Sequence, residues 1–421
     1  MAYQPQEIFT PRSHEVNKEM YITRPELEKR FKSAVLGSKQ IILHGESGTG
    51  KSWLYKKVFA DQSIAYITVN MAKVASRGSI DAVISSVADS LTGPRAVSYK
   101  EGKDAKVNAG FVNAGLSHVK DYVVPIQDNY LRLLNAFRWK IGSRKLGVVV
   151  FENIEAVVHN QEHLRQLCSL ILLADDEEYA RSHLGVLMVG TPSDLIELIA
   201  RCDNSNTVKN RIVELPEVTV LSEIGVKHFI EKGFFKLLKY RLQESENFSQ
   251  EQFIEEVRTS CDCVPQHLHE LCLEIALCVE DAENIIDETR FVEGKLQWVR
   301  SNLLSELATV KINLNQRSTK IRRRDQVLYT LANIRKFSFT PKEVENVLRK
   351  LFPEATRGVR LNVPQILSDL ANSDHPVIRQ NQLNSAYRFV SPKLKIVIHA
   401  ALKLGDGSVL VNDAVFGEVR G

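Results

Sequence analysis

Short apolar runs alternate with segments of helical periodicity over the first 220 residues. The runs cover 41–43, 64–69, 146–151 and 185–190, and a fifth strand is expected at 210–215. Helical patterns cover 20–36, where Pro25 suits the first turn, and 53–59, 78–91, 127–142 and 160–174, and a further helix is expected to open at Thr191-Pro192. A strand that is buried on both faces shows a continuous apolar run instead of an alternating pattern. Strands that alternate with helices form parallel sheets covered on both sides. The pattern therefore predicts an α/β fold with a parallel sheet.

The pattern changes after residue 220. Residues 221–283 are expected to be helical throughout, and 287–309 to form one long helix. Further helical patterns follow at about 324–335, 341–351 and 363–372, and the second begins with Thr340-Pro341, a good N-cap and first helical position. Two short strands around a polar turn come next, in PVIRQNQLNSAYRFVSP. Three short helices and a hairpin predict a winged helix-turn-helix domain.

These patterns predict four regions. They are a sheet-containing core at 1–220 with an inserted segment at 93–125, a helical lid and linker helix at 221–310, a winged-helix domain at 311–404, and a tail at 405–421. Gly405, Gly407 and Gly417 make a loosely held tail the expectation. A length of 421 residues agrees with several domains, because one hydrophobic core rarely serves so long a chain.

Composition narrows the protein class. The apolar content of 44% and the charged content of 25% are those of a soluble globular protein. No apolar run approaches the length of a membrane span, and the N-terminus lacks the apolar core of a signal peptide, so a cytoplasmic protein without a membrane partner is expected. The six cysteines have no framework spacing, which indicates reduced thiols.

A group of cysteines and histidines leaves a zinc site open as an alternative. The residues are Cys261, Cys263, Cys272, Cys278, His267 and His269. Cys272 and Cys278, however, fall within the apolar helical pattern LHELCLEIALCVE, which favours core thiols over metal ligands.

Charge is distributed unevenly along the chain. Residues 311–400 contain 17 Lys and Arg but only 6 Asp and Glu, a balance of +11. The last 21 residues carry −1, and the whole chain carries +4, so the first 310 residues carry −6. An acidic first part and a basic terminal domain favour a polyanionic partner for the latter, with duplex DNA as the prediction.

One stretch carries a chemical motif. The apolar run Ile41–Leu43 leads into eight residues that fit G-x-x-x-x-G-K-[ST] at every fixed position, namely Gly45, Glu46, Ser47, Gly48, Thr49, Gly50, Lys51 and Ser52. Glycines let backbone N–H groups turn around phosphate oxygens, and the following helix N-terminus adds positive partial charge. Lys51 is expected to reach the β- and γ-phosphates, and Ser52 to ligate Mg²⁺. The stretch predicts ATP binding.

The apolar run at 146–151 ends in acidic residues. Such a strand is typical of a second magnesium-binding position, which makes Glu152 the candidate metal ligand together with Ser52. The segment before a phosphate loop often packs against the adenine, which makes Tyr21, Ile22 and Arg24 candidate nucleotide contacts, although an ordinary surface helix explains them equally well.

This order of parts resembles the AAA+ ATPases of the origin-recognition and replication-initiator type, with their archaeal and bacterial relatives, and the transposition-helper ATPases. It is also similar to the STAND group of regulatory ATPases, and the likeness covers roughly residues 20–400. The resemblance implies that Thr191 senses the γ-phosphate and that Arg211 is an arginine finger toward a neighbouring subunit. It also implies that Val264-Pro265 begins the helix where the lid meets the nucleotide, so that Pro265 is a candidate contact.

Two departures from the family pattern matter. The usual Asp-Glu at the end of the second strand is Glu152-Asn153 here. An amide is no general base, although it can position water, and Glu155 is a candidate substitute. The lid has Gln266-His267 where initiators have an arginine, which leans toward the STAND form. A slow or conditional ATP hydrolase is therefore expected.

Two hypotheses about function follow from these features. In the first, ATP controls homo-oligomer assembly, and the winged domain binds duplex DNA. In the second, the chain is a regulatory scaffold whose winged domain docks a protein effector, as in an antiviral defence system. A metabolic kinase is a weaker third reading, because no small-substrate constellation accompanies the phosphate loop. The arginines expected to face DNA are Arg322, Arg323, Arg324, Arg357, Arg360, Arg379 and Arg388. Six phosphate contacts would give a slope of log K against log salt of about −5.

Overall fold

The structure is a computed structural model. It describes residues 3–416 except for 38, 93–127, 159, 192–204, 247, 281–282, 316–320, 335, 337, 381–385 and 406–407. The segment expected to be inserted, at 93–125, and the helix expected after Pro192 therefore lie outside the described residues. By their contacts, Met1–Thr23, Glu46–Gly50 and Thr219–Gly421 form one unit, called here the helical unit. Arg24–Gly45 and Lys51–Val218 form the second, the sheet unit.

The sheet unit contains the parallel sheet that the apolar runs predict. Its order is β2-β3-β4-β1-β5, and the strands are β1 (Gln40–His44), β2 (Ala65–Asn70), β3 (Gly147–Glu152), β4 (Leu184–Gly190) and β5 (Ile212–Glu214). Every neighbouring pair is parallel. Strand β1 lies between β4 and β5, with Ile42 opposite Met188 on one side and Glu214 on the other. The predicted α/β class is confirmed.

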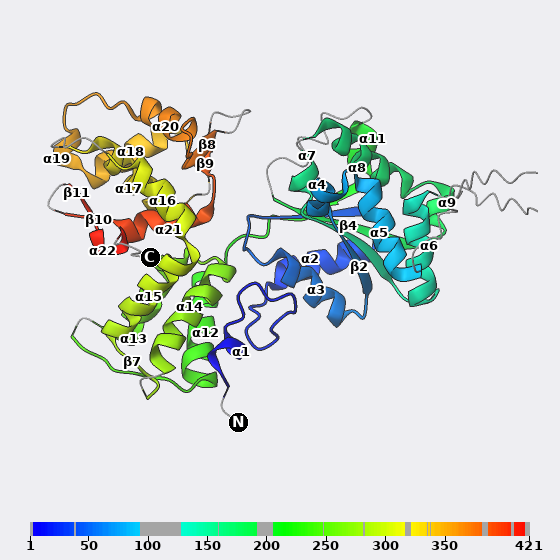
Figure 1. Ribbon diagram of the computed structural model, residues 1–421, viewed down its shortest axis with the longest axis horizontal. Coiled ribbons are helices and arrows are strands. Elements are labelled where there is room, and N and C mark those ends of the chain that lie inside the picture. Colours follow the sequence, from blue (N-terminus) through cyan, green and yellow to red (C-terminus); the bar gives the residue numbers. More distant parts are fainter. Residues whose placement is uncertain are drawn as a thin grey trace, which may run out of the picture. The chain divides into compact units, whose positions relative to one another are not determined.

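Helices cover both faces of this sheet (Figure 1). On one face, Phe31 of α2 (Pro25–Val35) and Leu54 of α3 (Lys51–Asp61) pack against Leu43 and Val150. On the other face pack α5 (Ile80–Thr92), α6 (Asn129–Ile141) and α8 (Gln161–Leu173), against Val149 and Phe151 among others. Shorter elements complete the unit: η1 (Met71–Lys73), α4 (Val74–Arg77), α7 (Glu155–Val158), α9 (Glu177–Ala180) and α11 (Ser205–Asn210). Successive side chains of β3 therefore pack into the hydrophobic cores on opposite faces of the sheet, as expected for a strand covered on both faces.

The first half of the helical unit is a bundle. It comprises α1 (Pro5–Ile8), α12 (Glu223–Ile230), the π-helix η2 (Glu231–Leu237), α13 (Gln250–Cys261), α14 (Pro265–Glu280) and α15 (Glu288–Asn302). Ile8 and Phe9 of the N-terminal segment are buried with Phe229 and Phe234, so the start of the chain packs on this bundle (Figure 1). Residues 221–283 are not helical throughout, because Arg241–Leu242 (β6) pairs in parallel with Ile285–Ile286 (β7).

The helix expected over 287–309 is two helices. Helix α15 ends at Asn302, and α16 (Leu304–Asn313) follows. Leu303 between them has φ −127° and ψ 21°, outside the helical region, and its side chain is fully buried. The side chain of Leu303 at the break therefore belongs to the core of the helical unit.

Helices and a hairpin form the second half of the helical unit. The main elements are α17 (Arg323–Asn333), α18 (Pro341–Leu351), α19 (Pro353–Thr356), α20 (Val363–Ala371), β8 (Ile378–Gln380), β9 (Tyr387–Phe389) and α21 (Pro392–Ala401). Strands β8 and β9 are antiparallel, and Phe339 forms a further antiparallel bridge with Tyr387. Thr340 caps α18 in a capping box with Glu343, as its position predicts.

The tail is more ordered than its glycines suggest. Strands β10 (Leu402–Leu404) and β11 (Val409–Val411) form an antiparallel pair, and α22 (Asp413–Phe416) follows. Val409 and Val415 are each 2% exposed, so apolar burial holds this segment in place. The expectation of a loosely held tail is therefore wrong for these residues.

The cysteines and histidines of the zinc alternative lie in the helical bundle. Cys261 and Cys272 are fully buried, and burial raises the pKa of both thiols, which disfavours the thiolate that zinc requires. Among the described residues, no group of three His, Cys, Asp or Glu side chains is placed to hold a metal ion. No helix in the described ranges is both long and apolar enough to span a bilayer.

His269 makes the helical unit sensitive to acid. Burial lowers the pKa of His269 to about 3, and its Nδ1 accepts a hydrogen bond from Thr10 N–H at 3.1 Å. The unfolded chain takes up a proton near the ordinary pKa of 6.5, whereas the folded chain does not. The free energy of unfolding should therefore decrease by about 1.4 kcal/mol per pH unit below that value.

The variant His269→Asn tests this pH dependence, because the asparagine oxygen can accept from Thr10 N–H but does not titrate. Urea unfolding between pH 7.5 and 4.5 should show that the wild type loses stability relative to His269→Asn as pH falls. Curves that run parallel over this range would contradict the assignment.

Candidate nucleotide site

The phosphate-loop sequence joins β1 to α3, as the sequence pattern predicts. Gly48 has φ +80° and Gly50 has φ +94°, a conformation that residues with a Cβ rarely adopt. Helix α3 begins at Lys51, so its N-terminal N–H groups and partial positive charge are directed at the loop. The backbone thus has the form that cradles phosphate oxygens.

Side chains of the loop are held by its own backbone. Lys51 Nζ donates to Gly45 O at 2.7 Å, and Thr49 Oγ1 donates to Glu46 O at 2.8 Å. Thr49 is 1% exposed, and Lys51 and Ser52 are half-buried. The ammonium group of Lys51 is therefore kept at the loop, within reach of a phosphate chain bound there.

Glu152 lies beside the loop at the end of β3. Its Oε1 accepts from Ser52 Oγ at 3.2 Å and from the Tyr55 hydroxyl at 2.9 Å. Burial and the Glu152 charge raise the pKa of Tyr55, so its hydroxyl stays protonated and donates. A carboxylate and a hydroxyl oxygen are ligands that Mg²⁺ accepts, so Ser52 and Glu152 fit a magnesium ion.

Asn153 occupies a constrained position one residue on. It has φ +56°, and its Nδ2 donates to Asn70 Oδ1 at 2.8 Å. Asn70 ends β2 opposite Glu152, and its Oδ1 also accepts from Ala72 N–H at 3.0 Å. The amide of Asn153 is thus fixed at the carboxyl edge of the sheet, where it can position water but not remove a proton.

Glu155 lies at the same sheet edge, in the first turn of α7. Its Oε2 is buried without a hydrogen-bond partner, and it lies 3.0 Å from where a Cβ on Gly190 would be. A buried carboxylate oxygen that lacks a partner is costly unless it serves a ligand, water or proton. Glu155 therefore remains the candidate for a carboxylate base at this edge, since the Asn153 amide cannot take a proton.

The variant Asn153→Glu tests whether position 153 is that of the missing base. A carboxylate there should raise steady-state ATP turnover by about 10-fold or more, while the ATP dissociation constant stays within about threefold. Asn70→Ala serves as a control, because it releases position 153 without adding a base. Turnover that is unchanged in Asn153→Glu and lost in Glu155→Gln would assign the base to Glu155.

Thr191 and Arg211 lie at opposite ends of the sheet unit's strands. Thr191 directly follows β4, whose last residue, Gly190, accepts from Gly45 N–H at 3.3 Å. Arg211 precedes β5, and its guanidinium forms an ion pair with Asp175 and donates to Thr207 O at 3.2 Å. The acid that Arg211 pairs with is on its own surface, whereas Glu214 pairs with His44 at 3.0 Å.

The remaining nucleotide-contact candidates are divided between the units. Arg24 is the N-cap residue of α2 in the sheet unit, and its N–H donates to Glu28 Oε1 at 2.7 Å. Tyr21 and Ile22 belong to the helical unit, where Ile22 lies against Gly225 of α12. Pro265 begins α14.

Gln266 next to Pro265 was not singled out as a contact, yet it lies directly at the phosphate loop. Its N–H donates to Gly48 O at 3.2 Å, and its Nε2 donates to the buried Glu270 at 2.8 Å. The Glu270 carboxylate also accepts from Arg12 at 3.3 Å and from the indole N–H of Trp298 at 3.4 Å. The N-terminal turn of α14 thereby contacts the phosphate loop at Gly48.

Three of the seven arginines expected to face DNA form hydrogen bonds or ion pairs within the helical unit. Arg322 pairs with the buried Asp325 at 2.6 Å. Arg323 donates to Ala355 O at 2.8 Å, and Arg324 donates to Asn313 O at 2.8 Å. Because breaking these bonds would leave buried acceptors unpaired, these three arginines are poor candidates for phosphate contacts.

The other four arginines lie around helix α20 and the hairpin, two of them exposed and two half-buried. Arg357 and Arg360 are exposed, and within the described ranges neither forms an ion pair. Arg379 and Arg388 lie directly opposite each other on β8 and β9. Arg388 Nη1 lies 3.5 Å from Glu46 Oε1 of the phosphate loop, and both side chains are 16% exposed.

Comparison with known proteins agrees with this fold. Residues 36–199 match the family described as AAA domain. No curated protein sequence matches the chain. A Walker-type ATPase of Pyrococcus abyssi is similar in structure, with 17% identity, coverage of 93% of this chain and 99% of that one, and a TM-score of 0.53.

Two further solved structures are more distant. The Orc1 protein of Aeropyrum pernix in complex with DNA has 12% identity, covers 94% of this chain and 96% of that one, and has a TM-score of 0.45. Cdc6p of Pyrobaculum aerophilum has 12% identity, coverage of 94% and 97%, and a TM-score of 0.42. The sheet unit has the fold of a P-loop AAA+ core.

Proposed function

We propose that this protein is an ATP-dependent switch whose nucleotide state controls self-assembly and the binding of duplex DNA through a winged-helix domain at 311–404. The observation that carries the nucleotide part is the contact of Glu152 with Ser52 beside a loop of phosphate-binding form. Lys51 binds the β- and γ-phosphates, and Ser52 and Glu152 hold Mg²⁺, which neutralises charge on the phosphate chain.

The residues at the sheet edge then set the rate of hydrolysis. Asn153, fixed by Asn70, positions water, and Glu155 is the carboxylate nearest to this edge that lacks a partner. Thr191 senses the γ-phosphate. Because no carboxylate stands at position 153, the protein spends most of its time with ATP bound, as a switch requires.

The contact between Arg388 and Glu46 supports a link between nucleotide and DNA. An arginine of the hairpin shares a half-buried ion pair with a residue of the phosphate loop. A guanidinium held by Glu46 cannot at the same time give its full charge to a DNA phosphate. A change in the loop on ATP binding therefore changes the charge that the hairpin offers to DNA.

Fluorescence anisotropy with a labelled 30-base-pair duplex at about 50 mM salt tests this function. We expect tighter binding with ATP and Mg²⁺ than with ADP, by about 10-fold, since P-loop switches bind their partners in one nucleotide state. A matched control is the same titration with Lys51→Ala, in which the two nucleotides should give equal affinity. No DNA binding at low salt in any nucleotide state would refute the DNA part.

In the proposed assembly, Arg211 reaches the γ-phosphate of a neighbouring subunit. Arg211→Ala should leave ATP binding unchanged but lower turnover and ATP-dependent assembly by about 10-fold or more. Asp175→Ala separates the structural role of Arg211 from its role toward a neighbouring subunit. This variant removes the ion pair on the chain's own surface but keeps Arg211. Equal loss in both variants would show that Arg211 serves only the local structure.

The scaffold function remains the second candidate, and one observation favours it. Three arginines of the basic domain are bound internally, so its charge excess is smaller at the surface than in the sequence. In that case the winged helix would dock a protein effector, as in a STAND-type defence system, and the anisotropy titration would show no binding.

A further inference from the structure

A cavity lies within the helical unit, away from the phosphate loop. Its volume is about 520 Å³, which falls in the range of small-molecule sites. One face of α13 and one face of α15 line it, together with residues of α21 such as Ile396 and Ala400. The cavity therefore lies where the bundle meets the C-terminal helices, and junctions of this kind are common places for ligand sites.

Aromatic side chains form much of its wall. Phe248, Phe291 and Trp298 all line the cavity, and each is at most 4% exposed. Phe248 and Phe291 have ring centroids 5.7 Å apart, so they present adjoining apolar faces. Walls of this kind suit a flat apolar body.

Two polar groups at the wall have unused hydrogen-bonding capacity. Ser260 is 5% exposed, and its Oγ is buried without a partner. His399 Nε2 bonds to Ala332 O at 2.8 Å, and because a carbonyl only accepts, Nε2 carries the proton. Burial lowers the pKa of His399, so the ring is neutral and its Nδ1 is an acceptor. A buried hydroxyl without a partner is costly unless a ligand or water satisfies it.

The charges around the cavity cancel. Glu256 and Glu288 are matched by Lys295 and Lys403, and Lys295 already pairs with Glu256 at 3.2 Å. A wall of zero net charge discriminates against an anion or a cation, because neither would recover the cost of leaving water.

We propose that this cavity is a binding site for an uncharged aromatic molecule with hydrogen-bonding groups, and that its occupancy is sensed at the phosphate loop. The link is a chain of contacts within the helical unit. Trp298 of the cavity wall donates to Glu270 at 3.4 Å, and Glu270 accepts from Gln266 at 2.8 Å. Gln266 in turn donates to Gly48 O at 3.2 Å.

A matched pair of probes tests the site in the full chain without nucleotide. Ligand-observed NMR titration should show binding of 2-naphthamide and at least tenfold weaker binding of the 2-naphthoate anion, which has the same ring system. Ala400→Phe, which fills the cavity, should weaken 2-naphthamide at least tenfold. Ser260→Ala should weaken it at least threefold, whereas substitution of the exposed Ser305 of α16 by Ala should have no effect.

Thermal unfolding shows whether Ala400→Phe is folded, and if it is not, Ser260→Ala and the two probes decide the matter. Failure of 2-naphthamide to bind the wild type, equal binding of both probes, or binding unaffected by Ser260→Ala would overturn the site.

A second titration tests the link to the loop, and this part rests on the proposed ATP binding. A non-hydrolysable ATP analogue with Mg²⁺ should change the 2-naphthamide dissociation constant at least threefold, and the probe should change ATP-analogue affinity by the same factor. Glu270→Gln should remove both changes. Equal probe affinity with and without bound nucleotide would overturn the link. Failure of the analogue to bind at all would instead refute the proposed function.

Discussion

Lys51→Ala is expected to weaken ATP binding by about 100-fold or more, which corresponds to about 3 kcal/mol. Lys51 is the cation at the start of α3, and its ammonium group lies at the loop through its bond to Gly45 O. Its removal leaves the β- and γ-phosphates with backbone N–H groups alone, and bonds between charged groups are the stronger ones. Isothermal titration with ATP and Mg²⁺ measures the loss.

A neighbouring lysine provides the control for this measurement. Lys57 lies on the same helix and forms an ion pair with Asp61, so Lys57→Ala removes the same charge from α3 away from the loop. This variant should bind ATP within about twofold of the wild type. Similar affinities in Lys51→Ala and Lys57→Ala, with both proteins folded, would reject the phosphate-loop assignment.

Replacing Arg357, Arg360, Arg379 and Arg388 together by Ala is expected to abolish DNA binding at about 150 mM salt. With these four as phosphate contacts, log K should decrease against log salt with a slope of about −3.6, instead of the slope of about −5 that six contacts would give. Removal of all four should reduce the slope to near zero and weaken binding to all sequences alike.

The control for the arginine variant is Arg181→Ala, which removes an exposed, ion-paired arginine from the sheet unit. Its anisotropy curve should overlay that of the wild type. If the variant with all four substitutions keeps a slope near −3.6, the DNA contacts lie elsewhere. A slope near −5 in the wild type would require phosphate contacts from the arginines that are bound internally.

The sheet and the loop were predictable because their signals are local. Continuous apolar runs such as Ile41–Leu43 and Leu146–Phe151 are typical of strands covered on both faces, as β1 and β3 are. The loop motif specifies its own backbone, since Gly48 and Gly50 adopt conformations that favour glycine. Pro25 and Thr340-Pro341 marked helix starts for the same local reason.

The contacts that tune the site were not predictable, because they depend on tertiary pairing. Tyr55 reaches Glu152 from 97 residues away, and Gln266 reaches Gly48 from helix α14. Asn70 is the one residue that sequence reasoning could have found, since a polar residue at the end of a buried strand lies at the carboxyl edge of the sheet. The break at Leu303 was missed because both flanking segments have helical periodicity.

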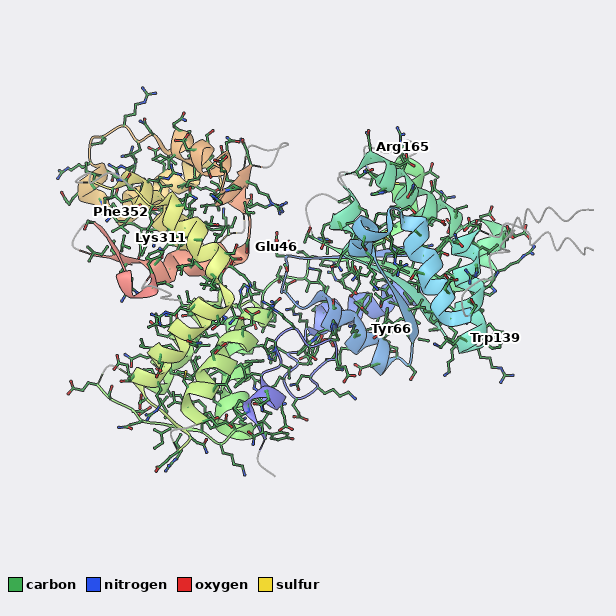
Figure 2. The ribbon with its side chains drawn as sticks, in the orientation of Figure 1. Glu46, Tyr66, Trp139, Arg165, Lys311 and Phe352 are labelled. Carbon is green, nitrogen blue, oxygen red and sulfur yellow. The ribbon has the colours of Figure 1, made fainter. Side chains whose placement is uncertain are left out.

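The surface apolar residues also show what a pattern does not reveal. Trp139 lies in the amphipathic helix α6, yet it is 85% exposed, and Figure 2 shows it at the outer edge of the sheet unit. Tyr66 on the edge strand β2 is partly exposed as well (Figure 2). Position in the fold, and not residue type, decides such exposure.

Mass photometry of the chain at nanomolar concentration, with and without ATP, Mg²⁺ and duplex DNA, tests the proposed switch most directly. We expect one species near 47.6 kDa, the mass of a single chain, with ADP or without nucleotide. With ATP and Mg²⁺ we expect multiples of that mass, and duplex DNA should stabilise these assemblies further. Lys51→Ala should remain at the mass of one chain in every condition. A wild-type protein whose mass is the same with ATP, with ADP and without nucleotide would contradict the account.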